Sequence, residues 1–440
     1  MRYDRRQPNH ASAALWLPTL WMLSAATKSL DAWFGVAGGS SESGGVVDPI
    51  FQSALLCLGL IVLTQRKVNW SKVTQANLWL VLLIGYMFMS ILWSDMPYVS
   101  FRRWVKELTA VVMALVILTE VSPREALQSV LRRMVYVLIP FSILLIKYYP
   151  HLGVIYGRWS GDIQWIGVTL QKNSLGRLAL TAAFFLLWVL MRRWKKQDVA
   201  VAKYQTYVEL FLLFLSLWLL KGPSLWAASA TALYSLGVGL IAFFAIVWMK
   251  KHRIRLGVTP WLVIVACIIG IGIVTPLVGG SNLAGFTSAV GRDATFTGRT
   301  EIWAEYLPSV MREPLLGHGF GGFYRVPAEA HNGYLDVWLG LGLVGLFLTS
   351  MFLLSSTRKA ALALADNDWA SVSLCFILMA AVHNITESSF DSFTRQLMGT
   401  VLFLSVCATT GRSRSHAMQP ASVDATTFFA DRGLQHSTKS

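Results

Sequence analysis

Long apolar runs separated by short polar segments make up most of the chain. A helix needs about 20 mainly apolar residues to cross the hydrocarbon core of a bilayer, and runs near this length recur along the sequence. We expect spanning helices at roughly 11–28, 49–64, 76–93, 104–121, 129–149, 174–191, 205–220, 224–249, 258–278, 333–356, 369–388 and 394–410. The pattern therefore predicts an all-α polytopic membrane protein with about 12 transmembrane helices.

The longest connection, residues 279–331, separates the ninth run from the tenth. Apolar residues recur in its middle, between residues 300 and 311, at helical spacing: Ile302, Trp303, Tyr306, Leu307 and Val310. We expect a short amphipathic helix that lies on the membrane face and is ended by Pro314. Glycines at 317, 319, 321 and 322 follow, and they would let the backbone pass close to a ligand.

This pattern divides the chain into four parts. Residues 1–278 hold the first nine spans, residues 279–331 form the large loop, and residues 332–410 hold the last three spans. The polar segment 411–440 is expected to be a disordered tail.

Composition and charge fix the orientation. The net charge is +15, yet charged residues make up only 14% of the chain, against roughly 25% in soluble domains. With both termini in the cytoplasm, 24 of the 38 Lys and Arg residues fall on the inner side, as the positive-inside rule requires. The basic excess therefore needs no nucleic-acid partner, and the large loop lies on the outer face.

Basic residues left on the outer side are candidates for binding an anion. They lie in outer loops or at outward-facing helix ends: Arg158, Lys172, Arg177, Lys221, Arg292, Arg299 and Arg325. Guanidinium groups match phosphate oxygens two at a time, so such a set suits a lipid-linked diphosphate. The alternative is that single residues hold ordinary lipid headgroups. For Arg299, which follows Gly298, we favour a functional role.

His331 stands where the polar loop meets the tenth apolar run. An imidazole titrates near neutral pH and can act as a general base, although a histidine at a helix start can also be purely structural. Asn332 follows, and Asp336 could orient the ring or, as we favour, cap the helix. His383 and Glu387 stand four apart and form a second candidate group, with a buried ion pair that fixes helix packing as the alternative.

The outer face carries no motif for a metal or cofactor. The one Asp-x-Asp pair, Asp366 and Asp368, falls in the predicted inner loop, on the opposite side of the membrane from the large loop. The four cysteines, Cys57, Cys267, Cys375 and Cys407, lie in apolar runs without the spacing of a zinc site. We expect no cofactor and a metal-free reaction with an already activated donor.

The motifs resemble those of the O-antigen ligase and polymerase superfamily of bacterial membrane glycosyltransferases. Four residues fill its pattern of His, Asn, a nine-residue interval, Gly, two residues and Gly: His331, Asn332, Gly342 and Gly345. The segments 297–303, 314–321 and 171–176 are similar to the exopolysaccharide-production branch.

The resemblance implies a substrate and a place. The donor would be a glycan on undecaprenyl diphosphate, the acceptor a sugar hydroxyl, and the site would face the periplasm from the inner membrane. His331 would act as the base, and basic residues would stabilise the leaving diphosphate. Ligases of the family carry an arginine after the seventh span, where this chain has Lys221. This departure favours a surface-polysaccharide polymerase over an O-antigen ligase that uses lipid A–core, and a transporter of lipid-linked sugar is a third alternative.

Overall fold

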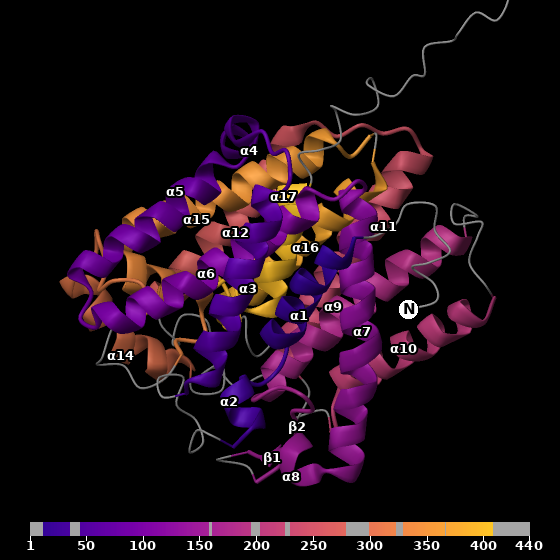
Figure 1. Cartoon of the computed structure of the whole chain (residues 1–440), viewed down its shortest axis with the longest axis horizontal. Helices are drawn as coiled ribbons and strands as arrows, with labels where there is room; N and C mark the ends of the chain where they lie inside the picture. Colours follow the sequence, from indigo (N-terminus) through magenta and orange to yellow (C-terminus); the bar gives the residue numbers. More distant parts are fainter. Residues whose placement is uncertain are drawn as a thin grey trace, which may run out of the picture.

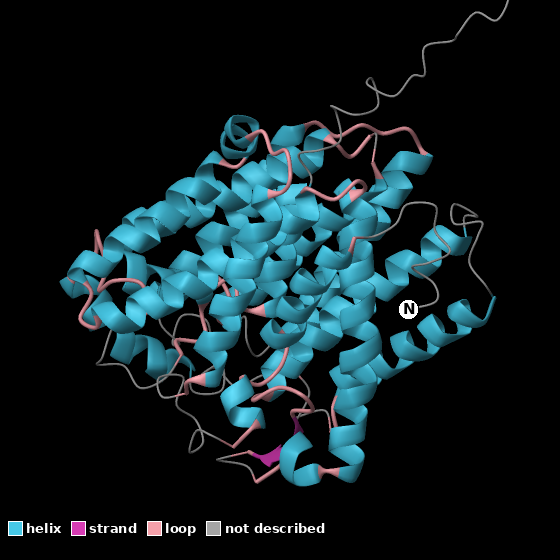
Figure 2. Ribbon diagram, in the orientation of Figure 1, coloured by secondary structure: helices cyan, strands magenta, loops and turns pink. Residues whose placement is uncertain are grey.

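The structure, a computed structural model, describes residues 12–35, 45–157, 161–194, 203–224, 229–278, 299–322, 329–365 and 367–407. It is almost entirely helical (Figure 2). The first half holds η1 Ala13–Leu15, α1 Trp16–Ala25, α2 Leu30–Trp33, α3 Val47–Thr64, α4 Trp70–Ala76, α5 Leu78–Met89, η2 Ser90–Trp93, α6 Pro97–Leu118, α7 Pro123–Tyr148, α8 Pro150–Gly153, β1 Val154–Tyr156 and β2 Ile163–Trp165. The second half holds α9 Lys172–Trp194, α10 Lys203–Lys221, α11 Ala230–Lys251, α12 Val258–Val278, α14 Arg299–Arg312, α15 Gly333–Leu362, α16 Asp368–Thr386 and α17 Gln396–Cys407.

Every apolar run expected to span the membrane falls on one of these helices. Among the described residues, seven helices are long and apolar enough to cross a bilayer: α3, α7, α9, α11, α12, α15 and α16. An eighth span is formed if α4 is taken together with the α5–η2 segment, which is bent from it by 88°. The other runs lie on α1, α6, α10 and α17. The all-α membrane fold is confirmed, and the count of about 12 spans stays a prediction.

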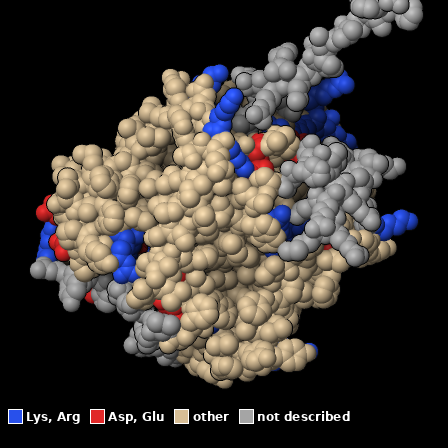
Figure 3. All heavy atoms as spheres, in the orientation of Figure 1, with Lys and Arg blue, Asp and Glu red and all other residues tan. Residues whose placement is uncertain are grey.

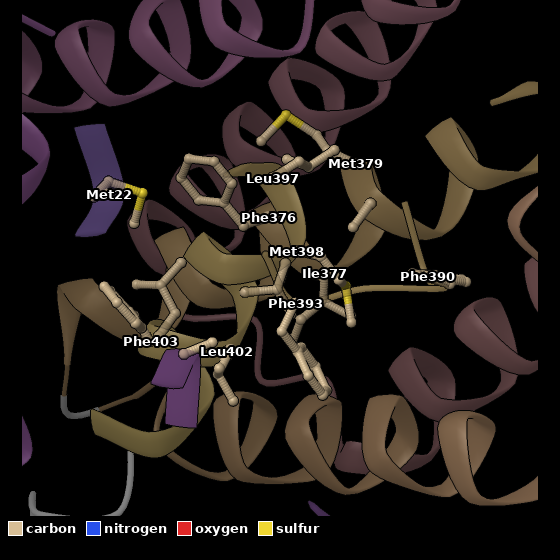
Figure 4. Packing of buried hydrophobic residues seen from close by; sticks show 14 of the residues in the cluster. Met22, Phe376, Ile377, Met379, Phe390, Phe393, Leu397, Met398, Leu402 and Phe403 are labelled. Atoms are coloured by element: carbon tan, nitrogen blue, oxygen red, sulfur yellow. The ribbon is translucent and has the colours of Figure 1, made fainter. Parts of the chain in front are cut away.

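The helices differ in how much of their surface the rest of the protein covers. The most apolar stretches of α9 and α16 are each 78% buried, whereas that of α3 is 22% buried and that of α12 is 33% buried. Figure 1 shows α16 and α17 in the middle of the bundle. Their side chains interlock there with Met22 of α1, and Phe376 and Phe403 lie in this packing (Figure 4). The core therefore fixes α16, whose C-terminal end is followed by Glu387.

The surface fits a surrounding membrane. Large apolar side chains are exposed on the outer helices, including Ile61 of α3, Phe214 of α10 and Ile241 of α11. On the face in Figure 3, charged side chains gather toward the upper edge and the left and right ends, and a broad central area has other residue types. At the lower end of Figure 1, α8 leads into the antiparallel hairpin of β1 and β2, in which Val154 pairs with Trp165.

The amphipathic helix expected in the large loop is α14. Its apolar side is not free to lie on a membrane, because Trp303, Tyr306 and Val310 are buried and α14 packs against α12 and α15. The expected placement on the membrane face is therefore wrong. The helix lies at the edge of the bundle (Figure 1) and turns its apolar side to the protein core.

Helix α15 is broken at Gly342, which has φ 65° and ψ −169°. The segment after α14 fills the break, since the backbone N–H groups of Leu343 and Val344 donate to the carbonyl oxygens of Pro314 and Leu315 at 2.9 and 3.2 Å. A Cβ on Gly342 would lie 2.2 Å from the Leu315 oxygen. Gly342 of the motif is thus required because the backbone of the segment after α14 passes too close to this position for a side chain.

The glycines between 317 and 322 serve the same packing. A Cβ on Gly319 would lie 2.5 Å from the Cβ of Ser94, and the Gly321 carbonyl accepts a hydrogen bond from Arg103 at 2.7 Å. These close approaches are to α6 and to the turn before it. The structure accounts for these glycines by packing within the protein, and a close approach of this backbone to a ligand stays a prediction.

Candidate functional site

His331 lies immediately before α15, and its neighbour Asn332 holds it there. The Asn332 side-chain oxygen accepts hydrogen bonds from the backbone N–H groups of Tyr334 and Leu335 at 3.0 and 2.9 Å, which caps the helix. The Asn332 amide nitrogen donates to the carbonyl oxygens of Gly272 and Ile385, both at 3.0 Å. One side chain therefore ties the start of α15 to α12 and α16.

The backbone of His331 is itself unusual. Its φ is 50°, in the left-handed region, which non-glycine residues adopt uncommonly and in which Asn, Asp and His are the most frequent of them. Ala330, just before it, is fixed on both sides: its carbonyl accepts from the Trp303 indole at 2.8 Å, and its N–H donates to Asp336 at 3.3 Å. These hydrogen bonds hold the backbone of His331 in its left-handed conformation. The side chain of His331 is 27% exposed.

Asp336 does not cap α15, contrary to the favoured interpretation of the sequence. Asn332 is the capping residue, and the Asp336 carboxylate instead binds the Ala330 N–H and the Ser388 hydroxyl. Asp336 therefore connects the segment that carries His331 to the segment after α16. It supports the site through the backbone.

Glu387 joins the site residues. Its carboxylate is 1% exposed, and one oxygen, Oε1, pairs with the Arg299 guanidinium and accepts from the Asn173 amide at 2.5 Å. The other oxygen, Oε2, lies 3.5 Å from His331 Nδ1. Burial raises the pKa of Glu387, but the contacts of its carboxylate with His331 and Arg299 outweigh burial and lower this pKa to about 2. The carboxylate of Glu387 is therefore ionised near neutral pH.

The structure thus brings four predicted site residues together: His331, Asn332, Arg299 and Glu387. They come from the ends of α14, α15 and α16, with the start of α9 beside them. Arg299, the favoured outer arginine, is the first residue of α14 and is largely buried against Glu387.

The other predicted cations are placed differently. Arg177 is buried in α9 and donates to the Ser388 carbonyl at 2.9 Å and to the Ser174 hydroxyl at 2.8 Å. Lys172 begins α9, next to Asn173, and Lys221 is the exposed last residue of α10. Arg292 lies outside the described residues, as do Arg158 and Arg325. A diphosphate-binding role stays a prediction for each of them.

His383 lies inside α16 and is completely buried. Within the described part of the chain, neither ring nitrogen has a hydrogen-bond partner. The shared helical face expected for His383 and Glu387 ends early, because α16 stops at Thr386 and Glu387 has extended backbone, with φ −147° and ψ 162°. This turn directs the carboxylate to His331 and Arg299.

Two contributors could not be assigned from the sequence. Asn173 contacts Glu387 across 214 residues of chain, and only its place in the quoted 171–176 segment drew attention to it. Arg395 pairs with Glu329 at 2.8 Å and with Asp391 at 3.0 Å. Because Glu329 lies two residues before His331, Arg395 fixes the approach to the site.

Comparison with known proteins supports the motif-based resemblance. A family model described as O-antigen ligase matches residues 215–350, a region that contains Arg299, His331, Asn332, Gly342 and Gly345. The chain is also 24% identical over 324 residues to the exopolysaccharide production protein ExoQ of Rhizobium meliloti (strain 1021), which covers 68% of each chain. These two matches confirm the predicted relationship to the O-antigen ligase and polymerase superfamily, with the likeness to its exopolysaccharide-production branch.

Proposed function

We propose that the protein is a membrane glycosyltransferase that polymerises a surface polysaccharide. It transfers a glycan from undecaprenyl diphosphate to an acceptor sugar hydroxyl on the periplasmic face of the inner membrane, with both of its own termini in the cytoplasm. The observation that carries the proposal is one buried carboxylate, Glu387, that contacts both a partly exposed imidazole and a guanidinium. The candidate base, His331, and the candidate anion-binding group, Arg299, are thus both in contact with the same carboxylate.

The reaction is a single displacement. The acceptor oxygen attacks the anomeric carbon, the bond from that carbon to the diphosphate oxygen breaks, and the acceptor proton passes to His331. Because Nδ1 of His331 faces Glu387, Nε2 is the nitrogen that receives the proton. Attack opposite the leaving group inverts the anomeric carbon. The ionised Glu387 stabilises the imidazolium as it forms.

The leaving diphosphate needs positive charge that is already in place. Arg299 supplies a permanent guanidinium beside His331, and Lys172, Arg177, Lys221 and Arg292 are the further candidates. Fixed cations replace the divalent metal that many sugar-nucleotide transferases use, so the mechanism requires none.

Two acceptors are compatible with this reaction, a growing polysaccharide chain and lipid A–core. The similarity to an exopolysaccharide production protein favours a growing polysaccharide chain as acceptor, which makes the protein a polymerase. The O-antigen ligase description of the matched region supports lipid A–core as the alternative acceptor.

Purified protein with a defined undecaprenyl-diphosphate-linked repeat unit tests both possibilities. We expect longer lipid-linked products from the donor alone, whereas a ligase would give product only when lipid A–core is added. His331→Ala should lower the rate about 10²–10⁴-fold. His151→Ala, at an exposed histidine of α8, is the matched control. No transfer to either acceptor by folded protein contradicts the function, and near-normal turnover of His331→Ala contradicts the base.

A further inference from the structure

In this structure the guanidinium of Arg299 is paired with a carboxylate. Its partner Glu387 is 1% exposed, and the Arg299 side chain is 10% exposed. A carboxylate this deeply buried is strongly unfavourable unless a cation or several hydrogen bonds compensate it. Arg299 and Glu387 therefore neutralise each other in this arrangement.

A donor diphosphate changes this balance. It carries several negative oxygens and competes with Glu387 for the same guanidinium, whose fork matches phosphate as well as carboxylate. The Glu387 carboxylate also repels the diphosphate directly, at a place where little water screens the two charges. Donor binding and the Arg299–Glu387 pair thus oppose each other.

We propose that Glu387 holds Arg299 before the donor binds and exchanges it for His331 during the reaction. When the diphosphate binds, Arg299 turns to it, and the charge of Glu387 is left for the imidazolium that forms as His331 takes the acceptor proton. Glu387 is a positioning residue in this scheme, since it touches no reacting atom. The inference rests on the proposed function and assigns the carboxylate a coupling role within it.

The contacts of Glu387 suit such an exchange. Arg299 and Asn173 share Oε1, whereas His331 faces Oε2, so the two cations occupy different oxygens of one carboxylate. Asn173 is neutral and its amide lies 2.5 Å from Oε1, so it continues to satisfy that oxygen after Arg299 turns away. The buried carboxylate keeps a hydrogen-bond donor on Oε1 throughout.

The scheme predicts opposite effects on donor binding and on turnover. Glu387→Gln keeps the shape of the side chain and removes its charge. The carboxylate then no longer competes for Arg299, so the donor should bind about tenfold more tightly or better, and the KM for donor should fall. The forming imidazolium loses its counter-charge, so kcat should fall by about two orders of magnitude. A merely structural role would weaken binding and turnover together.

A matched control for Glu387→Gln lies on α14, the helix that begins with Arg299. Glu301 is exposed and stands two residues after Arg299, so Glu301→Gln removes one negative charge nearby without touching the pair. It should leave donor affinity and kcat within about twofold. Glu387→Asp retains the charge on a shorter side chain, and we expect part of kcat to return while the donor still binds more tightly than in wild type.

Binding of undecaprenyl diphosphate in detergent micelles gives a measurement that does not depend on turnover. If Glu387→Gln binds undecaprenyl diphosphate as wild type does or more weakly, the exchange is refuted. If Glu387→Gln does not fold, weaker binding of the same probe by Glu387→Asp than by wild type refutes it instead. If His331→Ala loses transfer while Glu387→Gln binds the donor as wild type does, the exchange is rejected. The proposed function is then retained. Absence of transfer with tighter donor binding in Glu387→Gln rejects the function and retains the competition for Arg299.

Discussion

Replacing Gly342 by alanine should strongly destabilise the protein. Gly342 has φ 65° and ψ −169°, a region that is essentially restricted to glycine and costs other residues about 1–3 kcal/mol. A new Cβ would also lie 2.2 Å from the Leu315 oxygen and 2.6 Å from the Gly317 nitrogen. Both are backbone atoms, so relief requires moving the chain, at a further cost of about 1–3 kcal/mol.

The sum, about 2–6 kcal/mol, is a large fraction of the roughly 5–15 kcal/mol that stabilises a typical domain. Because the broken helix α15 also presents His331 at its start, transfer should fall with stability. Thermal unfolding of the purified protein in detergent measures the first effect, and the transfer rate well below the unfolding temperature measures the second.

The control is Gly85→Ala in α5, where a Cβ would meet nothing within 4 Å. Alanine favours helix over glycine by about 0.5–1 kcal/mol, so this variant should unfold at an equal or slightly higher temperature. If Gly342→Ala unfolds at the same temperature as Gly85→Ala and transfers normally, the close backbone crossing at the break is refuted.

Three further predictions concern the charges of the site. Arg299→Ala should lower donor affinity or transfer by about one to two decades, with Arg299→Lys recovering only part because it lacks the fork, and unchanged donor binding would remove Arg299 from the site. Transfer should continue in chelator, whereas a strict requirement for added Mg²⁺ or Mn²⁺ would contradict the fixed-cation mechanism. The lowered pKa of Glu387, about 2 against 4.5, means that its ionisation stabilises the fold fully above about pH 4.5 and that this contribution is lost as the pH falls toward 2. The difference in unfolding temperature between wild type and Glu387→Gln should therefore shrink as the pH falls from about 5 toward 2, and a difference that stays constant over this range would contradict the assignment.

Helix positions were predictable because apolar length alone sets them. Each expected run coincides with a helix, and α14 was expected from its apolar spacing within a polar loop. The surroundings of α14 were not predictable, because an amphipathic helix has the same pattern whether its apolar side meets lipid or protein. Trp303 is buried against the protein, where its indole holds the Ala330 carbonyl.

Site residues divide in the same way. His331 and Arg299 could be selected from the sequence because their chemistry is unusual where they stand. Asn173 could not, since an amide has no distinctive signal and its partner Glu387 lies 214 residues away. The role of Asp336 was misjudged because a carboxylate in a first helical turn commonly caps, and only the preceding Asn332 shows that the cap was already filled.

The distribution of the site over helix ends has a consequence for when the enzyme becomes competent during its synthesis. Asn173, Arg299 and His331 all precede Glu387 along the chain, and Arg395 comes later still. A nascent chain that stops before the end of α16 has already made the base and the guanidinium, but it lacks the carboxylate that orients both. Under the proposed function, truncated chains should therefore transfer no glycan, which can be checked with a variant that ends before Glu387.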